Sequence, residues 1–164
     1  MIICDASPLI HLTKMGKMEY VMKLFDTIII PPAVYREIIE EGIQHNYDDA
    51  KLLQNYHKNK QIQKLTPGIS DVILEGYLDR GEYEALLLTQ ELDLSIIIDE
   101  RKGRFVAEQR NFSFLSTMDI VLLLLKEKVI DYSTFEKNLG KYSAKGWVAK
   151  NVIQKYLEKG KQYE

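Results

Sequence analysis

Acidic residues stand at several positions where a carboxylate could do chemistry. Asp5 ends an apolar run near the start of the chain, and Asp99 ends a second run, LSIIID at 94–99. Aspartate is disfavoured in strands and costly to bury without a partner, so two strand-terminal aspartates at one cleft require a compensating cation. The alternative is that each of these carboxylates only caps the helix that follows it.

Further acids lie on segments that are predicted to be helical. Glu37 lies in the first turns of a helix that starts at Pro32. Glu82 and Glu84 open another helix, and they lie about 200° apart around its axis, so they cannot share a face. Acids near a helix N-terminus are favoured by the helix dipole, so each position alone says little about a site.

Taken together, the carboxylates form an oxygen-only ligand set that suits Mg²⁺ or Mn²⁺. Four carboxylates exceed what one Mg²⁺ usually takes from protein, so the set favours a pair of ions, as in a phosphodiesterase or nuclease centre. One ion would lower the pKa of an attacking water and the other would stabilise the leaving oxygen. Ser7 could hold Asp5 or a metal-bound water, or it could cap the following helix.

The composition favours no other kind of site. The single cysteine, Cys4, lies in an apolar run, so no internal disulfide is possible and we expect it to be buried. The three histidines lack zinc-site spacing, and neither GxGxxG nor a P-loop occurs. The longest purely apolar stretch, IVLLLL at 120–125, is too short to span a membrane, and we expect a cytoplasmic protein.

Charge is distributed unevenly along the chain. The 164 residues have a net charge of −2, but residues 137–164 contain seven lysines and only two acids. Such asymmetry can mark a phosphate-facing tail beside an acidic metal site, although a solvated helix face is the alternative for each lysine. Four cations just after Asp99 could likewise contact RNA phosphates or pair with nearby acids: Arg101, Lys102, Arg104 and Arg110.

Alternating strands and helices would position these residues. Continuous apolar runs at 1–5, 27–31 and 94–99, with a shorter one at 112–116, predict strands covered on both faces, as in a parallel sheet. Helices are predicted from Ser7 towards Gly16, from Pro32 to Gly42, over 47–59, 81–92, 101–110 and 117–128, and in the tail from Tyr132. This order is typical of an α/β fold, whose strands end at one common edge. We expect one domain, 1–164, with a basic helical tail from about 132.

Four stretches occur in order along the chain: IICDASPLIHL, IIIPPAVYREI, DRGEYEALLLTQELDLSIIIDERKGRFVAE and FLSTMDIVLLLLKEKVI. Over about residues 1 to 130 they resemble the PIN domain nucleases, in particular small archaeal and bacterial proteins similar to the toxin subunits of virulence-associated toxin–antitoxin pairs. The resemblance implies a three-layer α/β/α domain with a small parallel sheet, dependence on Mg²⁺ or Mn²⁺, and hydrolysis of single-stranded RNA. It assigns the catalytic and metal-binding roles to Asp5, Glu37, Glu82 and Asp99.

The resemblance leaves the third acid open between two glutamates. Glu82 lies 17 residues before Asp99, which matches the family's usual spacing, and Glu84 is its competitor. Glu100 adds a second acid beside Asp99 that could make a water-mediated contact. The chain departs from the commoner pattern by having Glu in place of Asp in the third block and Ile98 where a threonine usually stands.

Two classes of function therefore compete. One is a metal-dependent endoribonuclease, either the toxin of a toxin–antitoxin pair or a processing enzyme. The other is a non-catalytic PIN-like module that binds RNA or protein, which would be expected to lose at least one acid of the set. A receiver-like phosphoacceptor is disfavoured because no paired acid lies near the first strand. The expected partners are single-stranded RNA, a protein antitoxin and a second copy of the chain in a homodimer, joined through IVLLLL or the aromatic tail with Tyr142, Trp147 and Tyr156.

Overall fold

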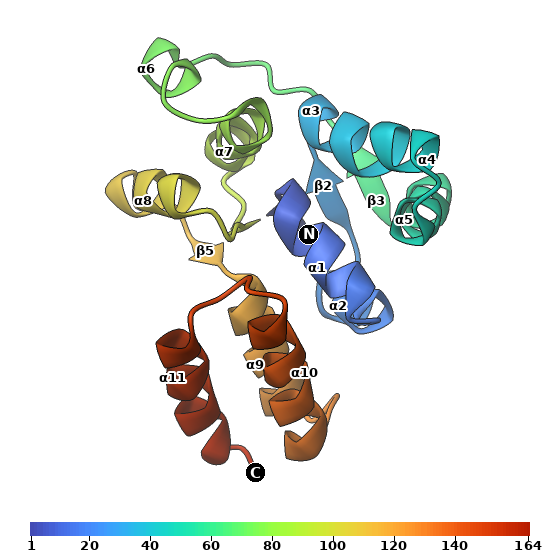
Figure 1. The fold of residues 1–164 in the computed structure, drawn as a ribbon. Helices are drawn as coiled ribbons and strands as arrows, with labels where there is room; N and C mark the ends of the chain where they lie inside the picture. The colour runs from blue at the N-terminus through green and yellow to red at the C-terminus, as the bar shows by residue number, and fades with distance from the viewer. The chain divides into compact units, whose positions relative to one another are not determined.

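A five-stranded, all-parallel sheet forms the centre of the fold in a computed structural model that describes residues 1–164 (Figure 1). The strands lie in the order β3-β2-β1-β4-β5. β2 and β3 therefore lie on one side of β1, and β4 and β5 lie on the other. Right-handed crossovers in these two opposite directions place helices on opposite faces of the sheet. This confirms the predicted three-layer α/β/α fold. The strands are β1 (Ile2–Cys4), β2 (Ile28–Ile30), β3 (Ile62–Lys64), β4 (Ile96–Ile97) and β5 (Phe114–Leu115).

Burial explains which strands were predictable. Ile3 on β1 lies opposite Ile29 on β2 and Ile96 on β4, and all three side chains are buried. Strands covered on both faces read as continuous apolar runs, which is why β1, β2 and β4 were predicted. β5, an edge strand with two half-buried residues, was predicted from the short apolar run at 112–116. β3 was not, because it is an edge strand in which only Ile62 is buried.

The first unit of the chain, Met1–Thr117, contains the sheet and most of the helices. The predicted first helix begins at Ala6 rather than after Ser7, so Asp5 itself takes the N-cap position. The helices are α1 (Ala6–Lys14), α2 (Met18–Phe25), α3 (Pro32–Tyr35), the π-helical segment η1 (Arg36–Glu41), α4 (Gly42–Gln44), α5 (Asp48–Lys58), α6 (Val72–Glu75), α7 (Arg80–Leu92) and α8 (Arg101–Gln109).

The helix that starts at Pro32 was predicted to end at Gly42, but it continues through that residue to Gln44. Gly42 has helical dihedrals, with φ −60° and ψ −38°. A Cβ at this position would lie 2.5 Å from the Cβ of Ala50 on α5. Glycine is therefore required here for close helix packing and not for chain termination.

The second unit, Met118–Glu164, is entirely helical. It holds most of α9 (Thr117–Lys126), together with α10 (Tyr132–Ala144) and α11 (Lys150–Lys161), and α10 packs against α11. Tyr142 is buried and packs edge-on against the Trp147 ring, with 5.2 Å between centroids, so these two aromatic residues contribute to internal packing. None of the helices in the chain has the length and apolar character needed to cross a membrane.

Candidate active site

The carboxyl ends of β1 and β4 meet where the sheet changes its direction of growth. The two strands are paired neighbours, with Cys4 opposite Ile97. Asp5 directly follows β1, and Asp99 follows β4 by two residues. Ligands of open α/β sheets bind beyond the strand ends at such a switch point. Both aspartates thus come from the edge of the sheet where a ligand site is expected.

Asp5 is buried among other acids. Its exposed fraction is 4%, and burial is the main reason that its pKa rises from 3.8 to about 7. The negative charges of Asp79, Glu82 and Glu37 add to this rise, whereas the Ala6 amide opposes it. We call Asp5, Glu37, Asp79 and Glu82 the acidic cluster.

Gly81 lies between two members of the acidic cluster. A Cβ built on Gly81 would lie 3.4 Å from Oδ1 of Asp5 and 3.5 Å from Oδ1 of Asp79. It would also lie 3.4 Å from a methyl carbon of Val34 on α3. A Cβ would therefore meet all three groups at ordinary contact distance, so the Gly81 backbone packs closely against both carboxylates and α3.

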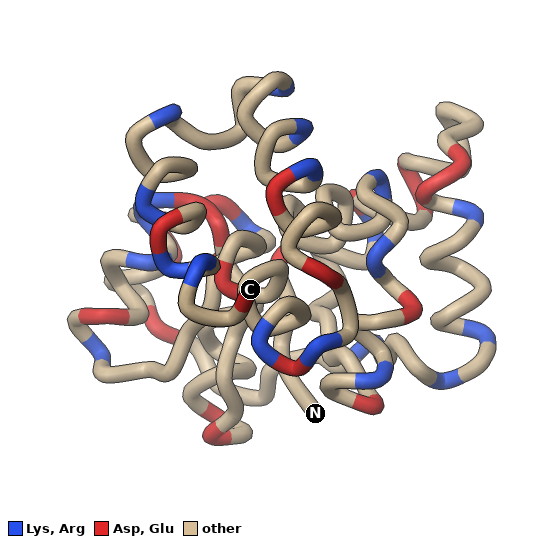
Figure 2. Tube along the Cα trace, turned by 90° about the horizontal axis from the view of Figure 1, so that it is seen from below, with Lys and Arg blue, Asp and Glu red and all other residues tan.

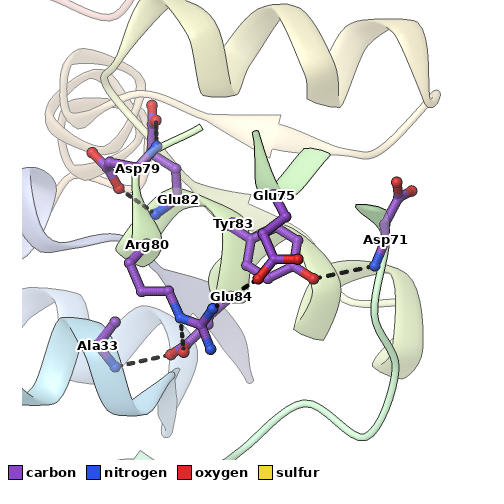
Figure 3. A network of polar contacts seen from close by, with 8 residues as sticks. All are labelled: Ala33, Asp71, Glu75, Asp79, Arg80, Glu82, Tyr83 and Glu84. Carbon is purple, nitrogen blue, oxygen red and sulfur yellow. Dashed lines mark hydrogen bonds and ion pairs between the residues drawn. The ribbon is translucent and has the colours of Figure 1, made fainter. Parts of the chain in front are cut away.

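A reciprocal pair of hydrogen bonds holds Glu82 at the start of α7 (Figure 3). The Glu82 amide donates to Oδ1 of Asp79 at 2.8 Å, and the Asp79 amide donates to Oε2 of Glu82 at 3.2 Å. This capping box satisfies two backbone N–H groups at the helix start. It leaves Oε1 of Glu82 buried and without a hydrogen-bond partner.

Burial also raises the pKa of Glu82, and the charges of Asp79 and Glu100 add to the rise. The nearby Gly103 amide opposes it without reaching hydrogen-bond geometry with Oε1. A buried carboxylate oxygen without a partner is costly and requires an explanation, of which an ion is one.

Glu84, the competitor of Glu82, has different partners. Its Oε1 accepts from Nε of Arg80 at 2.7 Å, and its Oε2 accepts from the Ala33 amide at 2.9 Å. The Ala33 N–H is in the first turn of α3, where N–H groups lack partners within the helix. Figure 3 shows the Glu84 carboxylate directed at Ala33, away from Asp79 and Glu82. Glu84 therefore joins α3 to α7, while Glu82 belongs to the acidic cluster.

Glu37 reaches the acidic cluster from η1. The residue as a whole is exposed, but its carboxyl group is partly buried. This partial burial, followed by the charges of Asp79 and Glu41, raises the pKa of Glu37. π-Helical turns are rare and are frequent at functional sites. The sequence predicted a helix here but not this local geometry.

Asp99 is held on both of its carboxylate oxygens. Oδ1 accepts from the Thr117 amide at 2.8 Å, and Oδ2 accepts from the Thr117 hydroxyl at 2.7 Å. Nδ1 of His11 lies 3.0 Å from Oδ2. Both oxygens of Asp99 thus have hydrogen-bond partners from α9 and α1, whereas Oε1 of Glu82 in the acidic cluster has none.

The remaining residues that the sequence suggested for the site lie at or near its edges or have other partners. Ser7 is half-buried in the first turn of α1, and no hydrogen bond joins its side chain to Asp5. Glu100 is exposed at the start of α8 and acts on Glu82 through its charge. Among the cations after Asp99, Arg110 pairs with Asp71 at 2.6 Å, which is a structural role.

Sequence reasoning missed Asp79, His11 and Thr117. The pattern Asp-x-x-Glu at 79–82 is a capping-box signature that could have identified Asp79. No local pattern connects His11 with Asp99, because 88 positions separate them.

The donor set fits a divalent cation. The acidic cluster provides only carboxylate oxygens, which Mg²⁺ and Mn²⁺ prefer, and it contains the unpartnered Oε1 of Glu82. Burial raises the pKa of Asp5 most and repulsion among the carboxylates adds to the rise, and a cation would offset this repulsion. No group of three acidic, histidine or cysteine side chains is already arranged to hold an ion, so binding requires the carboxylates to converge.

Comparison with known proteins gives one family match. The family model described as DUF3368: PIN domain matches residues 1–162, which include the acidic cluster and both units of the chain. None of the curated proteins matches the chain.

Proposed function

The chain belongs to the PIN domain family, whose members are in general nucleases, and on this premise we propose that it is a metal-dependent endoribonuclease. The proposed reaction is hydrolysis of single-stranded RNA by attack of water on the phosphodiester, with Mg²⁺ or Mn²⁺ as cofactor. The observation that carries the proposal is the acidic cluster, in which a buried Asp5 with a pKa of about 7 lies beside three further acids.

In this proposal Asp5, Glu37 and Glu82 hold the metal, and Asp79 is an additional acid that sequence reasoning did not include. When bound, divalent ions lower the pKa of a water and stabilise the leaving oxygen. Asp79 also fixes the start of α7, so its amide and carboxylate orient Glu82. Gly81 keeps the space between Asp5 and Asp79 free of a side chain.

Asp99 stays in the proposed ligand set, with Thr117 and His11 as its positioning residues. Hydrogen-bonded partners commonly orient metal-ligating side chains and tune their basicity. The three contacts fix the carboxylate before any ion arrives. Glu100 is the further acid that we propose for a water-mediated contact.

A binding module that does not cut RNA is the second candidate. The capping box favours it, because Asp79 and Glu82 stabilise the start of α7 whether or not a metal binds. Their presence therefore does not by itself require catalysis.

As partners we propose single-stranded RNA, a protein antitoxin and a second copy of the chain. The acidic cluster supports an antitoxin that presents arginine, because bidentate arginine–carboxylate pairs are strong. Exposed apolar side chains on α6, at Val72 (83% exposed) and Ile73 (80%), are compatible with a protein contact.

The decisive experiment compares two glutamates on one helix. Cleavage of a mixed single-stranded RNA pool is measured with Mg²⁺, Mn²⁺ or EDTA for wild type, Asp5→Asn, Asp99→Asn, Glu82→Gln and Glu84→Gln. We expect metal-dependent cutting that falls by at least about 10- to 100-fold in Asp5→Asn and Glu82→Gln, since even the hydrogen-bond partners of metal ligands are worth this much. Glu84→Gln is the matched control, and its folded fraction should cleave close to the wild-type rate.

Two results would oppose the proposal. Cutting that persists in EDTA would indicate a contaminant or another mechanism. An inert wild type that also takes up no Mn²⁺ in calorimetry would favour the binding module.

A further inference from the structure

A pocket of about 290 Å³ opens beside the acidic cluster. Its volume is near the lower end of the roughly 300–1,000 Å³ that is usual for small-molecule sites. Glu37 belongs both to its lining and to the acidic cluster, so the pocket adjoins the proposed catalytic site at this residue. The other lining residues on which the argument depends are Lys14, Glu41, His45, Tyr47 and Asp49.

Two aromatic rings form a flat wall of this pocket. The rings of His45 and Tyr47 are stacked, with 5.6 Å between centroids and 20° between planes. Tyr47 is nevertheless 56% exposed, so much of its ring is accessible to a ligand. Nucleic-acid bases stack on exposed aromatic side chains of this kind in proteins that bind single strands.

The turn that carries the rings is tightly bonded. Nδ1 of His45 lies 2.7 Å from the Glu41 carbonyl oxygen, and the Tyr47 amide donates to the Gly42 carbonyl at 2.9 Å. Asn46, between the two rings, has a left-handed conformation with φ 59°. The aromatic wall is therefore built before a ligand binds, which reduces the entropy cost of binding.

The charges of the pocket suit a base better than a phosphate. Glu41 and Asp49 would repel a phosphate, and Lys14 is the single lysine of the lining. Carboxylates accept hydrogen bonds from exocyclic amino groups, which adenine, cytosine and guanine carry and uracil lacks.

We propose that this pocket binds one unpaired base of the RNA beside the scissile phosphate, with Tyr47 as the stacking platform and Glu41 and Asp49 as acceptors. The inference rests on the proposed function, because the pocket shares Glu37 with the acidic cluster. A second cavity of about 500 Å³ shares Lys14, Tyr47 and Asp49 with the pocket. This second cavity offers space for a neighbouring nucleotide next to the pocket.

Binding is tested apart from cleavage, in the Asp5→Asn background with Mg²⁺. The probe is a short fluorescent single-stranded RNA of mixed sequence, together with the same RNA carrying one abasic nucleotide at each position in turn. Adding Tyr47→Ala should weaken binding about 5- to 100-fold, the usual range for loss of one stacked base. Tyr47→Phe should bind like the background protein, and so should the control Tyr77→Ala, which removes a ring that is 44% exposed and outside the pocket.

A double-mutant cycle identifies the contact itself. If the base lies on Tyr47, one abasic position should weaken binding to the protein with Tyr47, and the same RNA should lose little further affinity for the Tyr47→Ala protein. Adenine and cytosine homopolymers should bind more tightly than the uracil homopolymer, and Glu41→Gln with Asp49→Asn should reduce that difference. Additive losses at every position, or no measurable RNA binding, would overturn the inference.

The experiments give different results if the base-binding inference is wrong and if the nuclease proposal is wrong. If wild type cleaves RNA with metal and Tyr47→Ala binds and cleaves equally well, the pocket inference is wrong and the nuclease stands. If wild type never cleaves but binding depends on Tyr47 and on one base, the pocket stands and the chain is a binding module.

Discussion

At the scale of single residues, the carboxyl group of Asp5 couples stability to pH. Its folded pKa of about 7 exceeds the ordinary 3.8, so the folded state binds this proton more tightly than the unfolded chain does. The stabilisation is complete below about pH 4 and is lost as pH rises to about 7. In EDTA at pH 8, Asp5→Asn should therefore be more stable than wild type, with a free energy of unfolding that is roughly 1–3 kcal/mol higher.

Thermal melts followed by circular dichroism, over a pH series in EDTA, measure this difference. The gap between Asp5→Asn and wild type should widen with rising pH. Parallel curves for the two proteins would show that Asp5 is not the group responsible.

Metal should reverse the advantage of the Asp5→Asn variant. A ligand that binds only the folded state stabilises it by about 2.7 kcal/mol at a hundredfold excess over its Kd. Mn²⁺ should thus raise the melting temperature of wild type at pH 8, and it should have little effect on Asp5→Asn or Glu82→Gln. Equal shifts in all three proteins would place the ion elsewhere.

Removal of the Thr117 hydroxyl tests whether its hydrogen bond to Asp99 positions that carboxylate. Thr117→Val removes the 2.7 Å bond to Oδ2 and should lower the unfolding free energy by about 1–3 kcal/mol, since a charged acceptor loses a donor. If Asp99 is a ligand, Mn²⁺ affinity should also fall by about 10- to 100-fold. Thr89→Val is a matched control, because this buried hydroxyl bonds only within its own helix, to the Ala85 carbonyl. Calorimetric Mn²⁺ titration should show the affinity loss for Thr117→Val alone.

At the scale of elements, α8 packs on the end of β4 and on Glu82 through Gly103. A Cβ on Gly103 would clash with the Ile98 side chain and lie 3.1 Å from Oε1 of Glu82. Gly103→Ala should therefore cost about 1–3 kcal/mol, as overpacking does. Gly140→Ala, in α10, meets nothing within 4 Å and should stabilise the chain by up to about 1 kcal/mol. Urea unfolding of the two variants should show these opposite signs.

Elements were predictable where burial or capping leaves a local pattern. The doubly covered β1 and β4 appear as isoleucine-rich runs, and Asp5 and Asp99 stand out because they end those runs. β3 gave no such pattern because two of its three side chains face solvent at the sheet edge. The π-helical geometry of η1 depends on which carbonyl each N–H meets, and helix propensity does not encode that choice.

The candidate site was partly predictable for the same reason. Acids could be recognised one by one, but their separation into the acidic cluster and the Asp99–Thr117–His11 contacts depends on the tertiary structure. The choice of Glu82 over Glu84 as a cluster member depends on Arg80 and Ala33, which bind the Glu84 carboxylate.

At the scale of the whole molecule, basic and acidic positions are interspersed along the trace (Figure 2). The second unit nevertheless has nine lysines and six acids, whereas the first unit is net acidic. If RNA phosphates bind to the second unit, replacing the exposed Lys141, Lys150 and Lys155 by Gln should reduce the salt dependence of binding. The expected change is about 0.7 in the slope of log K against log salt for each phosphate that the variant no longer neutralises.

The control removes the same charge from the first unit. Lys23, Lys51 and Lys58 are exposed, and their replacement by Gln changes the net charge equally. Fluorescence anisotropy over a salt series measures both triple variants. Equal slopes for them would mean that net charge, rather than phosphate binding by the second unit, governs RNA affinity.

The position of β1 in the middle of the sheet also has a consequence for synthesis. β1 pairs with β4, and Asp99 meets Thr117, so the site cannot form until more than a hundred further residues have followed β1 from the ribosome. At a translation rate of 5–20 residues per second, this delay is roughly 5 to 20 s. If the chain is the ribonuclease that we propose, a half-made chain would therefore be harmless to the messenger RNA that encodes it, and cutting would begin only once the fold had closed.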